Sequence, residues 1–381
     1  KGDSIMKLTI HRGTFIQELQ TVQRAIAAKT TINILTGVKI DLSHQGLTLT
    51  GSNAEISIES FLSVENEQAQ MKIEEVGSIV LQARFFSEII RRLPEDEFTL
   101  EVIEQNQVEI TSGKANFTVN GLDADNYPHL PVIDTQNQIQ IPVHVLNKLI
   151  SETVFSVSQH ESRPILTGVH FVLSNQTLLA VATDSHRLSQ RKIPLENTND
   201  AFDIVIPGKS LTELSRSLTD EEEVITIRIM DNQVLFETKT MKFYSRLLEG
   251  AYPDTNRLIP TNFNTVIEFE GKEFLSAIDR ASLLSHEGRN NIVRLHIASD
   301  GVILYGNSPE IGKVEESLNY NHVSGEPLDI SFNPDYMKAA LRAFGDTTIK
   351  IQFISAIRPF ILEPSEGQGE FVQLITPVRT N

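Results

Sequence analysis

The chain has 381 residues, of which 40% are hydrophobic and 22% charged, values that are ordinary for a soluble globular protein of two or three domains. Its formal net charge of −17 argues against a simple basic nucleic-acid binder, and the absence of cysteine excludes disulfides and thiolate chemistry. No apolar run approaches the roughly 18 residues that a membrane-spanning helix needs.

No secretory signal pattern opens the chain, and we therefore expect a cytoplasmic protein. We also expect that Met6 is the natural first residue and that Lys1 to Ile5 are left over from expression.

The pattern of apolar residues predicts, in chain order, a strand, a helix and three further strands. Lys7 to His11 form the first strand. Apolar residues then follow at the spacing of one helix face, at Phe15, Leu19, Val22 and Ile26. Three alternating segments, separated by turn formers, come next near 37–43, 46–51 and 55–64.

The same order then restarts. Ile79 to Leu81 are expected to form a strand, and 84–92 a helix that Pro94 stops. Three more alternating strands are expected near 97–103, 107–112 and 115–121. Alternating strands with tight turns favour antiparallel sheets that bury one face.

Several peptides recur at intervals of about 125 residues. Ile34-Leu35-Thr36-Gly37-Val38 returns unaltered at 165–169, and Tyr127-Pro128 is echoed by Tyr252-Pro253. The strand-to-helix passage at 78–86 is echoed at 203–211 and again at 329–337. A repeat of this length is a whole domain rather than a solenoid turn. We therefore predict an α+β protein with three repeated domains, each of antiparallel sheet with two helices, at 6–127, 134–253 and 260–381.

The expected helices differ from the rest of the chain in charge. They span 12–29, 84–92, 142–163, 208–217, 272–289 and 335–344, and hold 15 basic against 9 acidic residues, about +6. Solvated faces explain the bias of any single helix. If all six face one surface, that surface is positive and could hold a phosphate backbone without reading sequence.

Two segments offer candidates for chemistry. The segment from Thr183 to Arg187 contains Asp, Ser and His together. Consecutive side chains do not converge as a catalytic triad requires. We therefore interpret the segment as a tight turn in which Asp184 bonds to the local backbone. Gly208-Lys209-Ser210 opens a helix but lacks the upstream glycine of a phosphate-binding loop, because Asp203 stands there. The ten histidines show no metal-ligand spacing, and we expect no metal and no cofactor.

Four segments together resemble one family, the bacterial DNA polymerase sliding clamps, which are the beta subunits of DNA polymerase III. They are Thr183 to Leu188, Tyr252 to Asp254, Phe332 to Tyr336, and Leu374 to Arg379. The resemblance covers essentially all of Met6 to Asn381. Two features depart from it. Ser185 stands where many relatives carry glycine, and Pro164-Ile165 replace an aromatic pair of some relatives, so aromatic stacking on DNA is not carried over to that place.

The resemblance implies a head-to-tail homodimeric ring of six similar domains, whose helices line a hole for duplex DNA. Such a clamp tethers the replicative polymerase to its template and has no catalysis. The family's DNA-facing residues would be Arg24, Arg163 and Lys209. Its ring-closing residues would be Phe117 and Val119 against Leu283 and Leu284, four residues that core packing would also explain.

The resemblance also implies a pocket for peptide tails of the polymerase, the clamp loader and other partners. Position by position, it would use aliphatic residues, two prolines, one tyrosine and a few donors: Leu166, Thr183, His186, Arg187, Leu188, Pro253, Arg257, Leu258, Asn333, Tyr336, Ile357, Leu374, Pro377, Val378 and Arg379. Such a composition suits an anchor pocket. Alternatively, the apolar tail that ends in Val378 is simply the last edge strand of the third domain.

Two other functions stay open on the residues alone. One is an enzyme that uses the turn from Thr183 to Leu188. The other is a peptide-binding scaffold that never encircles DNA.

Overall fold

The structure, a computed structural model, describes residues 5–133, 137–196, 198–287, 290–367 and 369–380. The chain divides into two compact units. Unit 1 comprises residues 1–144 and 213–247, and unit 2 comprises residues 145–212 and 248–381. The middle repeat therefore contributes to both units. The predicted α+β class with antiparallel sheets is confirmed, since every strand pairing among the described residues is antiparallel.

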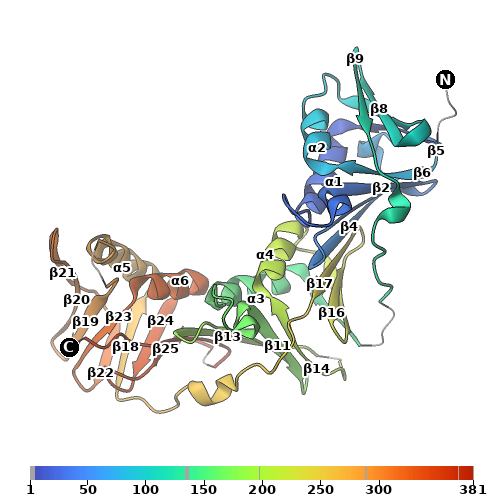
Figure 1. Ribbon diagram of the computed structural model, residues 1–381. Helices are drawn as coiled ribbons and strands as arrows, with labels where there is room; N and C mark the ends of the chain where they lie inside the picture. The colour runs from blue at the N-terminus through green and yellow to red at the C-terminus, as the bar shows by residue number, and fades with distance from the viewer. Residues whose placement is uncertain (1–4, 134–136, 197, 288–289, 368, 381) are drawn as a thin grey trace. The chain divides into compact units, whose positions relative to one another are not determined.

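Unit 1 contains a five-stranded sheet and an eight-stranded sheet, with α1 (Arg12–Gln23) and α2 (Ala83–Arg91) packed on them (Figure 1). The five-stranded sheet has the order β5 (Lys72–Glu75), β1 (Met6–His11), β7 (Glu97–Val102), β8 (Gln107–Ser112) and β9 (Ala115–Asn120). Its core includes Phe15, whose ring packs edge-on against Phe86 at 5.7 Å and Phe98 at 5.1 Å between centroids.

The eight-stranded sheet of unit 1 joins the first repeat to the middle repeat. Its order is β10 (Gln138–Pro142), β15 (Val224–Met230), β16 (Gln233–Glu237), β17 (Met241–Arg246), β4 (Ile56–Ser63), β3 (Gly46–Ser52), β2 (Gly37–Ser43) and β6 (Gly77–Gln82). The two repeats meet where β17 pairs with β4.

Unit 2 joins the middle repeat to the third repeat in the same way. Its nine-stranded sheet has the order β14 (Phe202–Pro207), β11 (Gly168–Ser174), β12 (Thr177–Thr183), β13 (Arg187–Pro194), β26 (Phe371–Ile375), β25 (Phe360–Pro364), β24 (Thr348–Phe353), β18 (Thr265–Glu270) and β22 (His322–Gly325). A second sheet has the order β21 (Gly312–Ser317), β20 (Gly301–Ser308), β19 (Val293–Ala298) and β23 (Leu328–Phe332). Figure 1 shows α5 (Gly271–Ser285) beside α6 (Pro334–Phe344) in this unit.

The two halves of each repeat exchange their first strands. In the first repeat, β1 pairs with β7 of the second half, while β6 pairs with β2 of the first half. The pairings β18–β24 and β23–β19 repeat this exchange in the third repeat. In the middle repeat, β10 pairs with β15 and β14 with β11. Each half therefore supplies a three-stranded meander whose last strand is free to pair with a neighbouring repeat.

Three predicted helices are shorter than expected. The helix predicted over 12–29 ends at Gln23, because the next amides, from Arg24 to Ile26, donate to carbonyls only three residues back. The helix predicted over 142–163 is α3 (Val143–Thr153), followed by a 3-10 turn; the Thr153 hydroxyl donates to the Leu149 carbonyl at 2.7 Å. The helix predicted over 272–289 ends at Ser285, and Arg289 lies outside the described residues.

These bounds reduce the predicted charge bias. Within α1, α2, α3, α4 (Gly208–Ser217), α5 and α6 there are ten basic and seven acidic residues, a net charge of +3 rather than about +6. Arg24, Lys29, Arg92 and Arg163 lie outside the α-helices. The net charge of the helices therefore does not by itself indicate a positive surface, which depends on where individual basic side chains lie.

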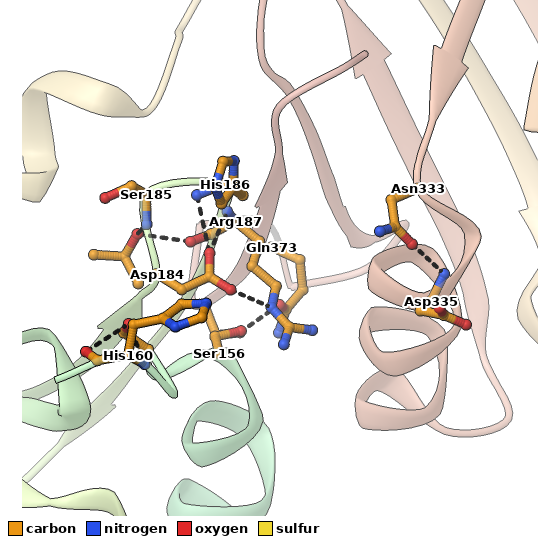
Figure 2. Close-up of polar contacts among 12 residues, drawn as sticks. Ser156, His160, Asp184, Ser185, His186, Arg187, Asn333, Asp335 and Gln373 are labelled. Atoms are coloured by element: carbon orange, nitrogen blue, oxygen red, sulfur yellow. Dashed lines mark hydrogen bonds and ion pairs between the residues drawn. The ribbon is translucent and has the colours of Figure 1, made fainter. Parts of the chain in front are cut away.

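A buried polar cluster lies under the β13–β26 pairing in unit 2. The Glu152 residue is 3% exposed, and its carboxylate lies 3.4 Å from the Arg191 guanidinium of β13. Beside it, the hydroxyls of Ser156 and Ser189 lie 2.5 Å apart, and Ser189 also contacts Gln373 of β26 (Figure 2). Burial raises the pKa of Glu152, while Arg191 and then Lys148 oppose that rise.

Removing Arg191 from this cluster should be costly. We expect Arg191→Met to lower the free energy of unfolding at pH 7 by about 3 kcal/mol, because the buried Glu152 carboxylate then keeps only the exposed Lys148, 3.9 Å away, as its counter-charge. Since burial raises the pKa of Glu152, the folded state takes up a proton at a higher pH than the unfolded chain does, so the loss should shrink as the pH falls through that raised pKa. Urea denaturation measures it, and adding Glu152→Gln should restore most of the loss. A loss of under about 1 kcal/mol at pH 7 would contradict this account.

Candidate functional site

The segment that joins β12 to β13 forms a tight turn in unit 2. The Asp184 carboxylate accepts from the backbone N–H groups of His186 at 2.9 Å and Arg187 at 3.0 Å (Figure 2). The Thr183 hydroxyl donates to the Arg187 carbonyl at 2.7 Å and accepts from the Ser185 N–H at 3.2 Å. The prediction of a local turn is confirmed, because the Asp184 side chain bonds to the backbone of His186 and Arg187 within the turn.

The turn needs a left-handed residue at its second position. Ser185 has φ +76°, a conformation that glycine adopts without the steric cost that a Cβ brings. This explains why glycine suits the position and makes the serine a strained choice. The Ser185 hydroxyl accepts from the Arg163 guanidinium at 3.2 Å, so the serine gains a contact that glycine lacks.

The turn brings Arg187 and His186 against the third repeat. The Arg187 guanidinium carbon lies 4.5 Å from the centroid of the Tyr336 ring, and its Nε donates to Asp184 at 3.1 Å. The His186 ring stacks on the same tyrosine at 6.4 Å and 20°. Burial, with the charge of Asp184 second, raises the pKa of Tyr336. The tyrosine is in the first turn of α6, which begins after the N-cap residue Asn333.

The C-terminal segment completes this arrangement. The N–H of Thr376 donates to the His186 carbonyl at 2.9 Å, and the N–H of Val378 donates to the Ser331 carbonyl at 2.8 Å. The alternative of an edge strand is wrong, because β26 pairs with β13 on one side and β25 on the other. These two pairings place the strand in the interior of the nine-stranded sheet.

Leu374 belongs to a buried aliphatic floor. It lies opposite Leu188 in the register, and the two are 6% and 1% exposed. They pack with Val181, Ile361 and Val372. Leu374 therefore covers a buried core, as the apolar residues of the alternative were expected to do, although its strand is not at an edge.

The linker after β17 packs beside this aliphatic floor. The Tyr252 hydroxyl accepts from the Thr183 N–H at 3.1 Å, and its ring stacks on His170 at 4.6 Å. His170 in turn lies 2.6 Å from the Asp203 carboxylate. Burial raises the pKa of Tyr252, so the hydroxyl stays neutral. Tyr252 thus fixes the linker at the residue before Pro253. The recurrence of Tyr127-Pro128 as Tyr252-Pro253 marked this tyrosine in the sequence, but the recurrence did not indicate what the tyrosine contacts.

All fifteen residues expected at the peptide pocket lie in unit 2. Five are buried: Leu166, Thr183, Leu188, Leu374 and Pro377. Five are partly exposed: Arg187, Pro253, Asn333, Tyr336 and Val378. Five are exposed: His186, Arg257, Leu258, Ile357 and Arg379. Direct contacts join the turn to Tyr336 and β26, whereas Leu166 lies in a 3-10 helix (Pro164–Thr167) and Ile357 in the β24–β25 loop.

Exposed apolar side chains form part of this surface. Leu258 is 51% exposed and Ile357 is 56% exposed, while Arg257 is held by Asp254 at 3.1 Å. An aliphatic floor with exposed apolar residues and a few hydrogen-bond donors suits a short apolar peptide. The described residues contain no group of three or more His, Asp or Glu side chains placed to hold a metal ion.

The residues expected to face DNA are exposed in the unit to which each belongs. Arg24 lies at the C-cap of α1, with its guanidinium 3.8 Å from Glu213. Arg163 precedes the 3-10 helix and donates to Ser185. Lys209 lies in the first turn of α4.

The four residues expected to close the ring occupy two surfaces. Phe117 and Val119 lie in β9, the end strand of the five-stranded sheet, and Phe117 is 39% exposed. Leu283 and Leu284 lie in the last turn of α5, where Leu283 is 71% exposed. Plain core packing therefore does not account for Phe117 or Leu283.

Three consecutive parts of the chain match one family. Residues 6–131, 140–254 and 256–379 match the N-terminal, central and C-terminal domains of the DNA polymerase III beta subunit. The chain belongs to this family. Figure 1 colours these parts in order along the chain.

Full-length relatives and solved structures agree with the assignment. The chain is 47% identical to the beta sliding clamp of Streptococcus pneumoniae strain TIGR4 and 50% identical to that of Bacillus subtilis, covering 99% and 98% of this chain and 100% of each relative. The crystal structure of the S. pneumoniae DNA polymerase III beta chain matches with a TM-score of 0.96 at 47% identity, over 98% of this chain and 100% of that one. The sliding clamp structure from B. subtilis matches with a TM-score of 0.96 at 49% identity, over 99% and 100%.

Sliding clamps of this family are processivity factors in DNA replication and not enzymes, and the chain shares that function. The family assignment disfavours the enzyme interpretation of the Thr183 to Leu188 turn. No helix among the described residues is long and apolar enough to cross a bilayer.

The strain at Ser185 gives a direct test of the turn. We expect Ser185→Gly to leave the free energy of unfolding unchanged or slightly higher, and Ser185→Val to lower it by about 1–2 kcal/mol, because a β-branched residue resists φ +76°. Urea denaturation measures both variants. Equal stability of the glycine and valine variants would show that the turn relaxes freely.

Proposed function

We propose that the chain acts in the cytoplasm as a homodimeric ring around duplex DNA and binds the peptide tails of its partners at the turn of unit 2. The observation that carries the peptide site is the β13–β26 pairing, which gathers the turn, Tyr336 and the C-terminal segment around a buried aliphatic floor. We further propose that the three repeats act as domains at 6–127, 134–253 and 260–381.

The peptide site would receive tails of the replicative polymerase, the clamp loader and other partners. Leu374 and Leu188 would form its floor, and Leu258 and Ile357 its exposed apolar rim. The guanidinium groups of Arg187, Arg257 and Arg379 would supply the donors that orient a polar group of the peptide.

Removing the C-terminal residues should weaken this site without opening the dimer. We expect deletion of Pro377 to Asn381 to leave a folded dimer and to reduce the affinity for a polymerase-tail peptide tenfold or more, about 1.4 kcal/mol. The deletion removes Pro377, Val378 and the bond of Val378 to Ser331. Sedimentation measures the dimer, and fluorescence titration measures the affinity for the peptide. Deletion of Thr380 and Asn381 alone is the matched control. Unchanged affinity in a folded dimer would place the pocket elsewhere, and loss of the fold would show that the segment is structural.

The ring needs two copies, because three domains form half of the six that the family arrangement requires. We expect Leu284→Asp to yield monomers at micromolar concentration, since a charge would be buried in an apolar contact. Analytical ultracentrifugation distinguishes the variant from a dimeric native protein. A native protein that sediments as a monomer at every concentration would remove the proposal.

The ring would hold DNA by topology rather than by affinity. We expect the loaded protein to stay on nicked circular DNA and to leave it on linearisation, and removal of the charges at Arg24, Arg163 and Lys209 to shorten residence on circles. Removal of three other exposed charges, at Lys192, Lys239 and Lys242, is the control. Equal retention on linear and circular DNA would favour the peptide scaffold that never encircles DNA.

A further inference from the structure

The linker that follows β17 lies along the end strand of the nine-stranded sheet. β14 stands at the end of that sheet and pairs with β11. The N–H of Leu248 donates to the Val205 carbonyl of β14 at 2.9 Å. Backbone groups at a sheet edge need partners, and the linker begins by supplying one of them.

The linker also completes the backbone bonding of Thr183. The pairing of β12 with β11 ends at Val181 and His170, two positions before Thr183. On the other side of β12, the N–H of Asp184 donates to β13. Hydrogen-bonded and non-hydrogen-bonded pairs alternate in an antiparallel ladder, so the N–H of Thr183 points to the β11 side. The Tyr252 hydroxyl accepts from it there at 3.1 Å, in place of a strand carbonyl.

A histidine of β11 holds the Tyr252 ring. The rings of His170 and Tyr252 stack at 4.6 Å between centroids and at 28°. The imidazole Nε2 lies 2.6 Å from a carboxylate oxygen of Asp203 in β14. Because an ionised carboxylate only accepts, Nε2 carries a proton and donates. This bond fixes the orientation of the imidazole, so Asp203 determines the surface on which the Tyr252 ring lies.

The Thr183 turn depends on this arrangement. The Thr183 hydroxyl accepts from the Ser185 N–H and donates to the Arg187 carbonyl, so this one residue spans the turn. Arg187 in turn lies on the Tyr336 ring. Fixing the backbone of Thr183 therefore helps to fix a guanidinium donor of the proposed peptide site.

The exposed rim of the peptide site depends on Tyr252 as well. A proline fixes its own φ and keeps the preceding residue extended, so Tyr252 sets the direction in which the linker continues through Pro253. The 3-10 helix Thr255–Leu258 follows, with Asp254 as its N-cap. This short helix carries the rim residues Arg257 and Leu258.

The first repeat lacks this arrangement, although it has a Tyr-Pro pair of its own. The Tyr127 hydroxyl is buried and meets no hydrogen-bond partner among the residues that the structure describes. Lys39 follows the recurring peptide Ile34 to Val38 as His170 follows its copy, but Lys39 pairs with Asp41 of its own strand at 3.3 Å. The arrangement around Tyr252 is therefore not a requirement of the repeated fold, and it occurs in the unit that carries the peptide site.

We infer that Asp203 and His170 are positioning residues of the peptide site, which act through Tyr252 on the Thr183 turn and on the linker. This inference rests on the proposed peptide binding. Asp203 orients His170, His170 holds the Tyr252 ring, and the Tyr252 hydroxyl holds the turn. The affinity for a peptide therefore depends on a carboxylate that is not among the residues expected at the pocket.

The exposure of Asp203 makes the inference testable without disturbing the fold. The Asp203 side chain is 72% exposed, whereas that of His170 is 14% exposed. A pair with one exposed partner contributes little to the stability of a fold. Replacement of Asp203 should therefore leave the fold intact, and a change in peptide affinity can be assigned to the residues that Asp203 positions.

Titration with a synthetic polymerase-tail peptide tests the inference. We expect Tyr252→Phe to weaken binding about fivefold, the effect of one hydrogen bond, and Asp203→Ala to weaken it at least about threefold. Asp203→Asn keeps an oxygen that accepts from the imidazole and should bind within about twofold of the native protein. Tyr127→Phe is the control for the hydroxyl. Asp300→Ala is the control for the charge, since Asp300 is an exposed acid in the turn between β19 and β20.

Two further measurements separate positioning from a general loss of stability. In Tyr252→Phe the amide of Thr183 should exchange at least about tenfold faster, while the amides of β24 in the same unit keep their native rates. In a His170→Phe protein, Asp203→Ala should cause no further loss of affinity, because Asp203 acts through the imidazole.

The outcomes distinguish this inference from the proposed function. Tyr252→Phe and Asp203→Ala proteins that bind as their controls do would overturn the inference while peptide binding stands. An equal loss in Asp203→Asn and Asp203→Ala, or an unchanged Thr183 amide in Tyr252→Phe, would overturn it as well. A native protein that does not bind the peptide would overturn the peptide site itself.

Discussion

The structure depends on one antiparallel pairing, made by the last strand of a meander with the last strand of a meander in the next repeat. It occurs as β4–β17 in unit 1 and β13–β26 in unit 2. Backbone groups at a strand edge need partners, and this pairing satisfies them while turning separate sheets into continuous ones. It also orders the C-terminal segment, which would fray if it lay at an edge.

The same backbone geometry carries different chemistry at the two junctions. Asn53 accepts from the N–H groups of Glu55 and Ile56, much as Asp184 accepts from two N–H groups in its turn. Tyr244, however, stands where the other junction has Leu374, and packs on Ile133 of its linker. Burial, together with the charges of Glu59 and Glu237, raises the pKa of Tyr244 to about 12. The position of Leu374 in the aliphatic floor of unit 2 is therefore occupied in unit 1 by the Tyr244 ring, with Glu59 and Glu237 near it. This difference supports one peptide site per chain, at the β13–β26 junction.

Local patterns in the sequence predicted the repeats and most strands. Alternation and turn formers located β2 at Gly37–Ser43 and β8 at Gln107–Ser112, because each strand buries one face. Helix ends were predicted less well, since apolar spacing continued beyond Gln23 while the backbone had already tightened. The short exposed strand β5 was missed because it carries little apolar signal. The exchange of first strands and the site geometry depend on contacts distant in sequence. Nothing local to Arg187 indicates that its guanidinium lies on Tyr336, and the strand pairing supplies the physical reason for their proximity.

Amide hydrogen exchange of the native protein tests the central claim most directly, that the β13–β26 pairing holds the middle repeat and the third repeat together. The account predicts that amides of β26 exchange as slowly as those of the interior strand β12, because both strands are paired on two sides. Exchange of the β26 amides at least about tenfold faster than that of the β12 amides would contradict it.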